Sequence, residues 1–173
     1  MKYVFAALFA TLAAGAAIAQ DSPASVKVQL KNNAGAAVGE ATVTEAPNGV
    51  LLRIQAKGLT PGWHGLHFHE KADCSKSDLT TAGGHVHGEA TMVHGLLNPD
   101  ANEAGDLPNL FVAADGSAQA ELFSTYVSLA GSKVKLMDKD GSALVIHANA
   151  DDHKTQPIGG AGARIACGVI PGA

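Results

Sequence analysis

Short runs of alternating apolar and polar residues, separated by turn sequences, constrain the fold of this chain most strongly. Residues 26–30 alternate valine and leucine with polar side chains, a pattern that places the apolar residues on one face of a β-strand. The alternation recurs at 40–46 and 50–54, on either side of the turn sequence Pro-Asn-Gly at 47–49. These two runs predict a β-hairpin.

The second half of the chain has the same character but contains two long stretches without periodicity. These stretches, 74–108 and 149–162, are rich in turn-forming residues and include several histidines. Long unpatterned segments inside a compact domain are usually functional, so we expect two functional loops. Strands are expected at 109–113 and 118–123, forming a second hairpin, and at 143–147 and 164–170.

The composition agrees with a fold made of short strands. The chain has 20 glycines and only 16% charged residues, which is typical of many turns rather than long surface helices. No convincing helical pattern is present. We therefore predict an all-β protein, an antiparallel sandwich or flattened barrel of about eight strands with two long functional loops.

The first residues have the pattern of an export signal. Lys2 provides a positive charge, residues 3–16 are apolar, and Ala-Ile-Ala at 17–19 is a small-x-small cleavage site. A membrane anchor is the competing interpretation, but the apolar stretch is short and alanine-rich for a bilayer span. We expect residues 1–19 to be a signal peptide and residues 20–173 to form one periplasmic domain that is not inserted in a membrane.

Charge and cysteine content restrict the partners and the compartment. The formal net charge is −4 with histidines neutral, which argues against nucleic acid as a partner. Cys74 and Cys167 are the two cysteines, and in an exported protein such a pair is expected to form one disulfide. Two buried free thiols are the alternative.

The stretch Gly62–Glu70 contains three of the eight histidines. On a strand, His67 and His69 share one face and Leu66 and Phe68 share the other. Two imidazoles side by side on a stiff element suit copper or zinc. Two exposed histidines without a metal are the alternative for this stretch alone.

Five segments in order along the chain resemble the copper–zinc superoxide dismutases of the bacterial, exported kind. The resemblance implies a Greek-key fold and covers nearly the whole expected mature chain. Its specific segments are His64–His69, Ala82–His85, Ala104–Asn109, Val145–His147 and Gly162–Ile170.

The resemblance assigns roles residue by residue. His67, His69 and His147 match copper ligands, and His85 matches the histidine that bridges copper and zinc. His94 and Asp106 match zinc ligands, and Asp152 matches an aspartate that links a copper histidine to a zinc histidine. Arg164 matches the arginine beside the open copper face, and His64 matches a buried supporting histidine. Cys74 and Cys167 match the disulfide of the family.

Glu103 departs from the family pattern, which has another zinc histidine at this position, nine residues after His94. Glutamate can bind zinc, so three outcomes are open: zinc bound by His85, His94, Glu103 and Asp106; weaker zinc binding; or a site left to copper alone. We favour a retained zinc site. His87 and His153 are possible substitute ligands, although we prefer to regard both as solvated loop residues.

The implied activity is dismutation of superoxide by a redox-cycling copper, with zinc beside it. A positive charge such as that of Arg164 would attract the small anion, and Lys71, Lys76 and Lys154 are further candidates for steering it. The alternatives are a non-catalytic domain that holds copper or zinc, and a copper-only dismutase. Both a monomer and a homodimer are compatible with the sequence.

Overall fold

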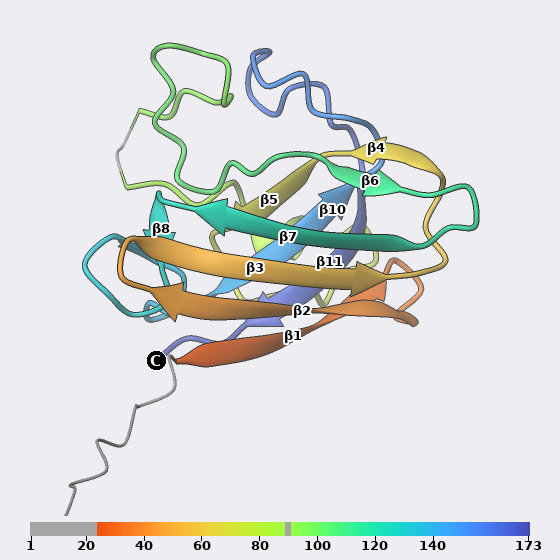
Figure 1. Ribbon diagram of the computed structural model, residues 1–173, viewed down its shortest axis with the longest axis horizontal. Coiled ribbons are helices and arrows are strands. Elements are labelled where there is room, and N and C mark those ends of the chain that lie inside the picture. The colour runs from red at the N-terminus through yellow and green to blue at the C-terminus, as the bar shows by residue number, and fades with distance from the viewer. Residues whose placement is uncertain (1–23, 89–90) are drawn as a thin grey trace, which may run out of the picture.

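The computed structural model describes residues 24–88 and 91–173, so the expected signal peptide at 1–19 lies outside the described residues (Figure 1). Within the described ranges, the chain forms eleven strands and one 3-10 helix, which confirms the all-β prediction. The bounds are β1 Ser25–Asn32, β2 Ala37–Ala46, β3 Gly49–Ala56, β4 Gly62–His64, β5 Leu66–His69, η1 Thr80–Ala82, β6 Leu110–Val112, β7 Ala118–Ser124, β8 Val127–Ser128, β9 Val134–Lys135, β10 Ser142–His147 and β11 Arg164–Ile170.

Seven strands form one antiparallel sheet in the order β5-β10-β11-β1-β2-β3-β7. In Figure 1, β1, β2, β3 and β7 lie in front and β5, β10 and β11 lie behind, so the sheet curves into a half-barrel. Two ribbons accompany it, antiparallel β4–β6 and parallel β8–β9. The count exceeds the predicted eight because β4, β8 and β9 have only two or three residues, too few for a recognisable alternation.

The first predicted hairpin is confirmed and the second is wrong. β2 and β3 pair from Gly39↔Ala56 to Ala46↔Gly49 across the expected turn. The turn after β6 also forms, with the Ala113 N–H donating to Ser117 O at 2.8 Å. However, β6 pairs with β4 and β7 pairs with β3, so the two strands diverge after the turn. A turn sequence determines a local reversal, whereas strand partners depend on packing elsewhere in the sheet.

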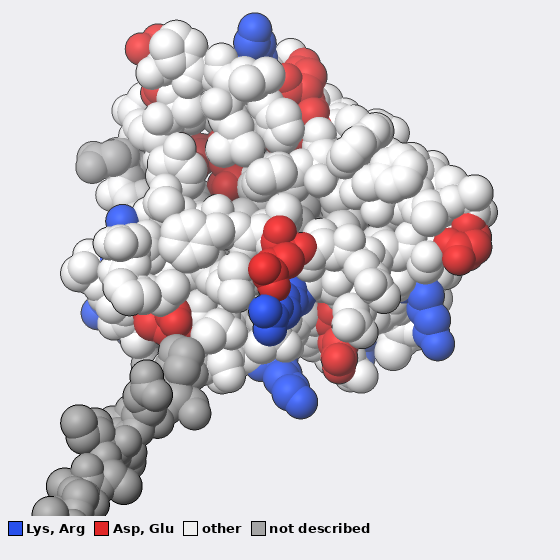
Figure 2. Space-filling model, in the orientation of Figure 1, with Lys and Arg blue, Asp and Glu red and all other residues white. Residues whose placement is uncertain are grey.

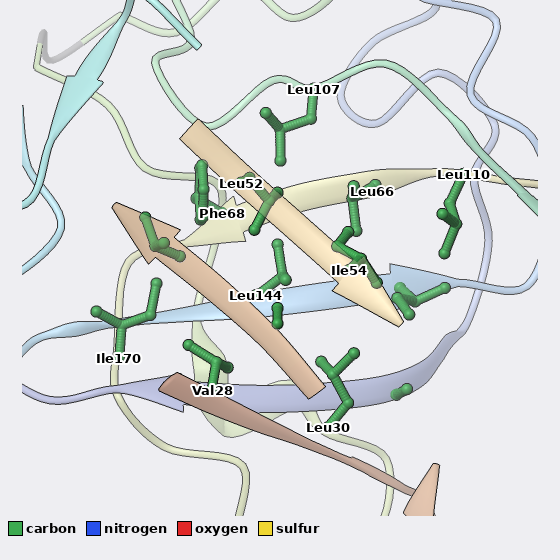
Figure 3. Packing of buried hydrophobic residues seen from close by; sticks show 14 of the residues in the cluster. Val28, Leu30, Leu52, Ile54, Leu66, Phe68, Leu107, Leu110, Leu144 and Ile170 are labelled. Carbon is green, nitrogen blue, oxygen red and sulfur yellow. The ribbon is translucent and has the colours of Figure 1, made fainter. Parts of the chain in front are cut away.

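Apolar side chains from the concave face of the sheet form the main core. Leu30, Leu52, Ile54, Phe68 and Leu144 are fully buried there and face one another across the half-barrel (Figure 3). Burying each such side chain contributes about 1.5–3 kcal/mol relative to leaving it exposed. The core packs against the inner faces of β5 and β10, and the histidines of β5 lie on the opposite, outer face.

The outer face of β10 supports a smaller apolar cluster that includes the disulfide. Ala143, Val145 and Leu79 pack with the Cys74–Cys167 bridge, whose Cα atoms are 5.9 Å apart. The expected disulfide is therefore confirmed. It connects the long loop that follows β5 to strand β11.

The surface of the described part of the chain carries mixed charges. On the face shown in Figure 2, lysine and arginine side chains stand singly among acidic and uncharged ones. Among the described residues, no helix has the length and apolar character needed to cross a membrane.

Candidate metal centre

The histidines of β5 lie on the outer face of the sheet, as their alternation predicts. His67 and His69 pair with Val145 and Ala143 of β10, while Leu66 and Phe68 point into the core. His147 ends β10 beside this face, and His85 joins it through an isolated bridge with His69. The two long loops, green and blue in Figure 1, both lie above the ends of β5 and β10.

One group of four imidazoles is arranged to hold a metal ion. His67, His69, His85 and His147 are all buried and each offers a ring nitrogen within 4.8 Å of the others. The Nε2 atoms of His69 and His147 are 3.3 Å apart. Within residues 24–88 and 91–173, the buried atoms His67 Nδ1 and His85 Nε2 have no hydrogen-bond partner. Because buried polar atoms are normally paired, these two nitrogens fit a metal ion.

The opposite nitrogen of three of these rings is held by a hydrogen bond. His69 Nδ1 donates to Gly83 O at 3.0 Å and His147 Nδ1 donates to Gly162 O at 3.1 Å. His67 Nε2 donates to Asp151 Oδ2 at 2.8 Å. Such bonds determine the tautomer and leave the other nitrogen free to bind a metal.

Burial keeps three of the four imidazoles neutral, whereas hydrogen bonds to Asp106 and Glu103 outweigh burial at His85 and raise its pKa. Burial lowers the pKa of His67 to about 4 and that of His147 to about 3, and it holds the pKa of His69 well below its usual range. These three rings are therefore unprotonated near pH 7. A metal ion can bind them without displacing protons from these nitrogens.

A second group shares His85 and contains two carboxylates. His94 Nδ1 is 2.9 Å from both Glu103 Oε2 and Asp106 Oδ1, and His85 Nδ1 is 2.8 Å from Glu103 Oε2 and 3.5 Å from Asp106 Oδ1. All four residues are buried. This set of two imidazoles and two carboxylates fits a divalent ion such as zinc. Glu103 thus points into the expected zinc site.

In this second group, hydrogen bonds between the carboxylates and the histidines outweigh the effect of burial on their pKa values. Burial alone would lower the pKa of His94, but hydrogen bonds to Asp106, Asp151 and Glu103 raise it to about 11. Burial likewise opposes ionisation of Glu103 and Asp106, yet hydrogen bonds from the histidines lower the pKa of both. Without a metal ion, protonated imidazole therefore neutralises the acidic groups of this site.

Asp151, and not Asp152, links the two groups. Asp151 is buried and accepts hydrogen bonds from His67 Nε2 at 2.8 Å and from His94 Nε2 at 3.1 Å. The role predicted for Asp152 is therefore wrong by one residue. The exposed Asp152 carboxylate instead accepts N–H bonds from Lys154 and Thr155, which stabilise the local turn.

Arg164 lies at the start of β11, opposite His147 in the ladder. Its guanidinium donates to the carbonyl oxygens of Leu79 and Gly83. Gly83 O is the acceptor that also holds His69, so the arginine and a ring of the four-imidazole group share one anchor. The side chain is half-buried, which leaves part of its positive charge accessible from outside.

Comparison with known proteins assigns the family. The family model described as copper/zinc superoxide dismutase matches residues 37–170. The chain belongs to the copper/zinc superoxide dismutase family.

Bacterial dismutases resemble the chain over most of their length. The copper–zinc superoxide dismutase of Caulobacter vibrioides is 64% identical over 148 residues, which cover 84% of this chain and 85% of that protein. A copper–zinc superoxide dismutase of Salmonella typhimurium is 38% identical and covers 98% of this chain and 99% of its own.

Solved structures of this family share the Greek-key barrel. The copper/zinc superoxide dismutase of Brucella abortus superposes with a TM-score of 0.69 at 33% identity, over 85% of this chain and 99% of that chain. A double mutant of a dismutase-like protein from Bacillus subtilis superposes with a TM-score of 0.79 at 44% identity, over 84% and 97% of the two chains.

The remaining histidines of this family member surround the two groups. His64 is buried with its ring nitrogens 2.7 Å from His147 O and 2.8 Å from Thr60 O, a supporting position. His87 Nδ1 contacts His85 O at 2.9 Å, and His153 Nε2 lies 3.3 Å from Asn109 Nδ2. Among the described residues, the two clusters of potential metal ligands are His67, His69, His85 and His147, and His67, His85, His94 and Asp106. Glu103 adjoins the second cluster through His85 and His94, whereas neither His87 nor His153 belongs to either cluster.

Asn109 supports the main chain at Asp151, a role that was not predicted from the sequence. Its side chain donates to Asp151 O at 2.8 Å and accepts from Asp151 N at 2.9 Å. It thereby ties the backbone that carries the linking carboxylate to the segment that carries Asp106. Its place three residues after Asp106, in a segment that carries the family resemblance, was the available signal.

The candidate steering residues Lys71, Lys76 and Lys154 are all exposed.

Proposed function

We propose that the protein is a superoxide dismutase, which converts two superoxide anions and two protons into oxygen and hydrogen peroxide. The observation that carries the proposal is the buried four-imidazole group, in which His67 Nδ1 and His85 Nε2 have no hydrogen-bond partner in the part of the chain that the structure describes. Copper bound by His67, His69, His85 and His147 would supply the one-electron redox change. His67, His69 and His147 present neutral rings whose outer N–H groups are held by Asp151, Gly83 O and Gly162 O.

Arg164 is the residue we assign to the substrate. Superoxide is a small anion in a protein of net charge −4, so a local positive charge is needed to attract it. The guanidinium is anchored by Leu79 O and by Gly83 O, which also holds His69. Two of its five N–H donors make those bonds, and the others remain to orient an anion.

We assign zinc to His85, His94, Asp106 and Glu103. Their ligand atoms converge, with nitrogen-to-oxygen distances between 2.8 and 3.5 Å. Asp151 lies behind this site and binds His67 of the copper group as well as His94. This convergence favours a two-metal enzyme over the alternative of a copper-only dismutase.

The other alternative is a non-catalytic domain that stores or delivers copper or zinc. In such a domain an anchored arginine beside the copper group would have no purpose. The position of Arg164 therefore favours the enzyme.

Replacement of Arg164 tests the function directly. In protein reconstituted with copper and zinc, Arg164→Glu should lower kcat/KM for superoxide roughly tenfold or more, because attraction becomes repulsion. Copper content measured by mass spectrometry should remain near one ion per chain. Arg164→Lys keeps the positive charge and should retain more activity than Arg164→Glu. The control is Arg53→Gln, which removes one member of an exposed surface ion pair. Equal activity in all four proteins would contradict the role of Arg164.

We further propose that the protein is exported to the periplasm after cleavage behind Ala19. The signal pattern at residues 1–19 supports this, as does the disulfide, since such bonds persist in oxidising compartments. Mass spectrometry of protein from a periplasmic fraction should find a chain that begins at Gln20. A chain that retains its first residues in the cytoplasmic fraction would contradict the proposal.

The oligomeric state is a separate question. Sedimentation of the mature protein would decide between monomer and homodimer.

A further inference from the structure

The second metal site carries more negative charge than the family pattern implies. Where that pattern has a third histidine, this chain has Glu103, which faces the site together with Asp106. Two carboxylates supply a formal charge of −2, which a divalent ion neutralises when both imidazoles are neutral. The donor set is thus two nitrogens and two carboxylates instead of three nitrogens and one carboxylate.

The backbone holds Glu103 in this orientation. Its main chain forms an isolated antiparallel bridge with His87, and the Gly105 N–H that follows donates to Val86 O at 2.8 Å. The side chain is almost fully buried, with 5% of its surface exposed. Glu103 Oε2 then contacts both His85 and His94. Its direction is therefore set by main-chain pairing of Glu103 and Gly105 with residues 86–87.

The two carboxylates differ in their remaining oxygen. Asp106 Oδ2 accepts the Gly95 N–H at 2.7 Å and is occupied by the protein. Glu103 Oε1 takes part in none of the hydrogen bonds found within residues 24–88 and 91–173. Glu103 can therefore bind an ion through both oxygens, which raises the number of ligand atoms from four to five without adding a residue. Larger and harder ions favour such additional oxygen ligands.

We propose that Glu103 makes the second site a two-imidazole, two-carboxylate site that accepts Mn²⁺ as well as Zn²⁺. Imidazole favours zinc, whereas carboxylate oxygen suits manganese. Exchanging one nitrogen donor for a carboxylate reduces the preference for zinc without abolishing it, because zinc still binds such ligands more tightly in the general order of divalent ions. The inference rests on the proposed assignment of copper to the four-imidazole group, but not on dismutase activity.

The test is a competition between Mn²⁺ and Zn²⁺ for the second site. It uses the mature protein, residues 20–173, which already holds one equivalent of copper. Free Mn²⁺ is followed by its electron paramagnetic resonance signal, and the ratio of the two dissociation constants is compared between the unaltered protein and Glu103→His. The variant should favour zinc over manganese by roughly tenfold more than the unaltered protein. Glu103→Gln, which keeps the shape and removes the charge, should weaken both ions and manganese more. Glu121→Gln, at an exposed carboxylate, should leave the ratio unchanged.

The outcomes separate this inference from the proposed function. If Glu103→His leaves the manganese-to-zinc ratio within about twofold of the unaltered protein, Glu103 does not set the selectivity and the inference is wrong. Failure of the unaltered protein to bind millimolar Mn²⁺ would overturn it as well. A missing Cu(II) signal from four nitrogen ligands, or absent superoxide consumption in the copper–zinc form, would instead contradict the proposed function.

Discussion

At the scale of single residues, the centre depends on how each carboxylate is shared between histidines. Asp151 accepts one hydrogen bond from each metal-binding group, so its position couples the orientation of His67 to that of His94. The neighbouring Asp152 is exposed and closes a turn. Two adjacent residues of the same type therefore have unrelated roles, and only the direction of the side chain separates them.

The pair of aspartates provides an internal comparison. Asp151→Asn removes a carboxylate that orients one ligand of each group, and should lower zinc affinity by about 10–100-fold. Asp152→Asn should leave the affinity nearly unchanged, because its carboxylate contacts only the local turn. Competition with a chromophoric chelator measures both variants. Equal losses in the two variants would show that Asp151 does not link the groups.

At the scale of elements, the metal-binding residues are aligned by close packing of three strand-like segments. The segment 103–106 lies against 85–87 on one side and against β5 on the other, through bonds from Phe68 N to Gly105 O and from Gly105 N to Val86 O. A Cβ at Gly105 would lie 2.3 Å from Phe68 O. Glycine is therefore required here for close approach of the main chain, which brings Glu103 and Asp106 to His85.

Alanine substitutions test this close approach. Gly105→Ala should destabilise the protein by about 1–3 kcal/mol, since the added methyl group has to displace main-chain atoms. It should also weaken zinc binding by moving Asp106. Gly84→Ala is the matched control, because its Cβ would meet only Glu70 Oε1 at 4.0 Å. Urea unfolding of the metal-loaded variants provides the measurement, and a loss in Gly84→Ala equal to that in Gly105→Ala would refute the explanation.

At the scale of the whole molecule, the metal-free protein contains two histidine groups with opposite responses to pH. The pKa values of His67 and His147, about 4 and 3, lie below the value near 6.5 expected in the unfolded chain. Their contribution to stability is present above pH 6.5 and is lost as the pH falls toward 4. The pKa of His94, about 11, is raised, so its contribution is present below pH 6.5 and is lost as the pH rises toward 11.

We therefore expect the metal-free protein to be most stable near pH 6.5 and to lose stability in both directions. The free energy of unfolding by urea, measured from pH 4 to pH 10, should show this maximum. In His94→Gln the decline above pH 6.5 should be reduced, while the decline below it remains. A monotonic dependence in the unaltered metal-free protein would contradict the opposed charges of the two groups.

The sequence alone determined the residue types of the centre and placed His67, His69 and His147 on strands. Alternation placed His67 and His69 on one face of β5, and the family resemblance named His85, His94, Asp106 and His147, because a period of two and a matching motif are both local properties. The Pro-Asn-Gly turn at 47–49 was likewise predictable.

Only the tertiary structure decided which side chains converge at the two candidate metal sites and which strands pair. The direction of Glu103, the choice of Asp151 over Asp152, and the separation of β6 from β7 all depend on contacts between segments far apart in the chain. Such contacts form through packing and long-range pairing, which leave no periodic signal in the residues themselves. The histidines of β5 could thus be predicted from the sequence, whereas the convergence of Glu103 and Asp106 on one site depends on the tertiary structure.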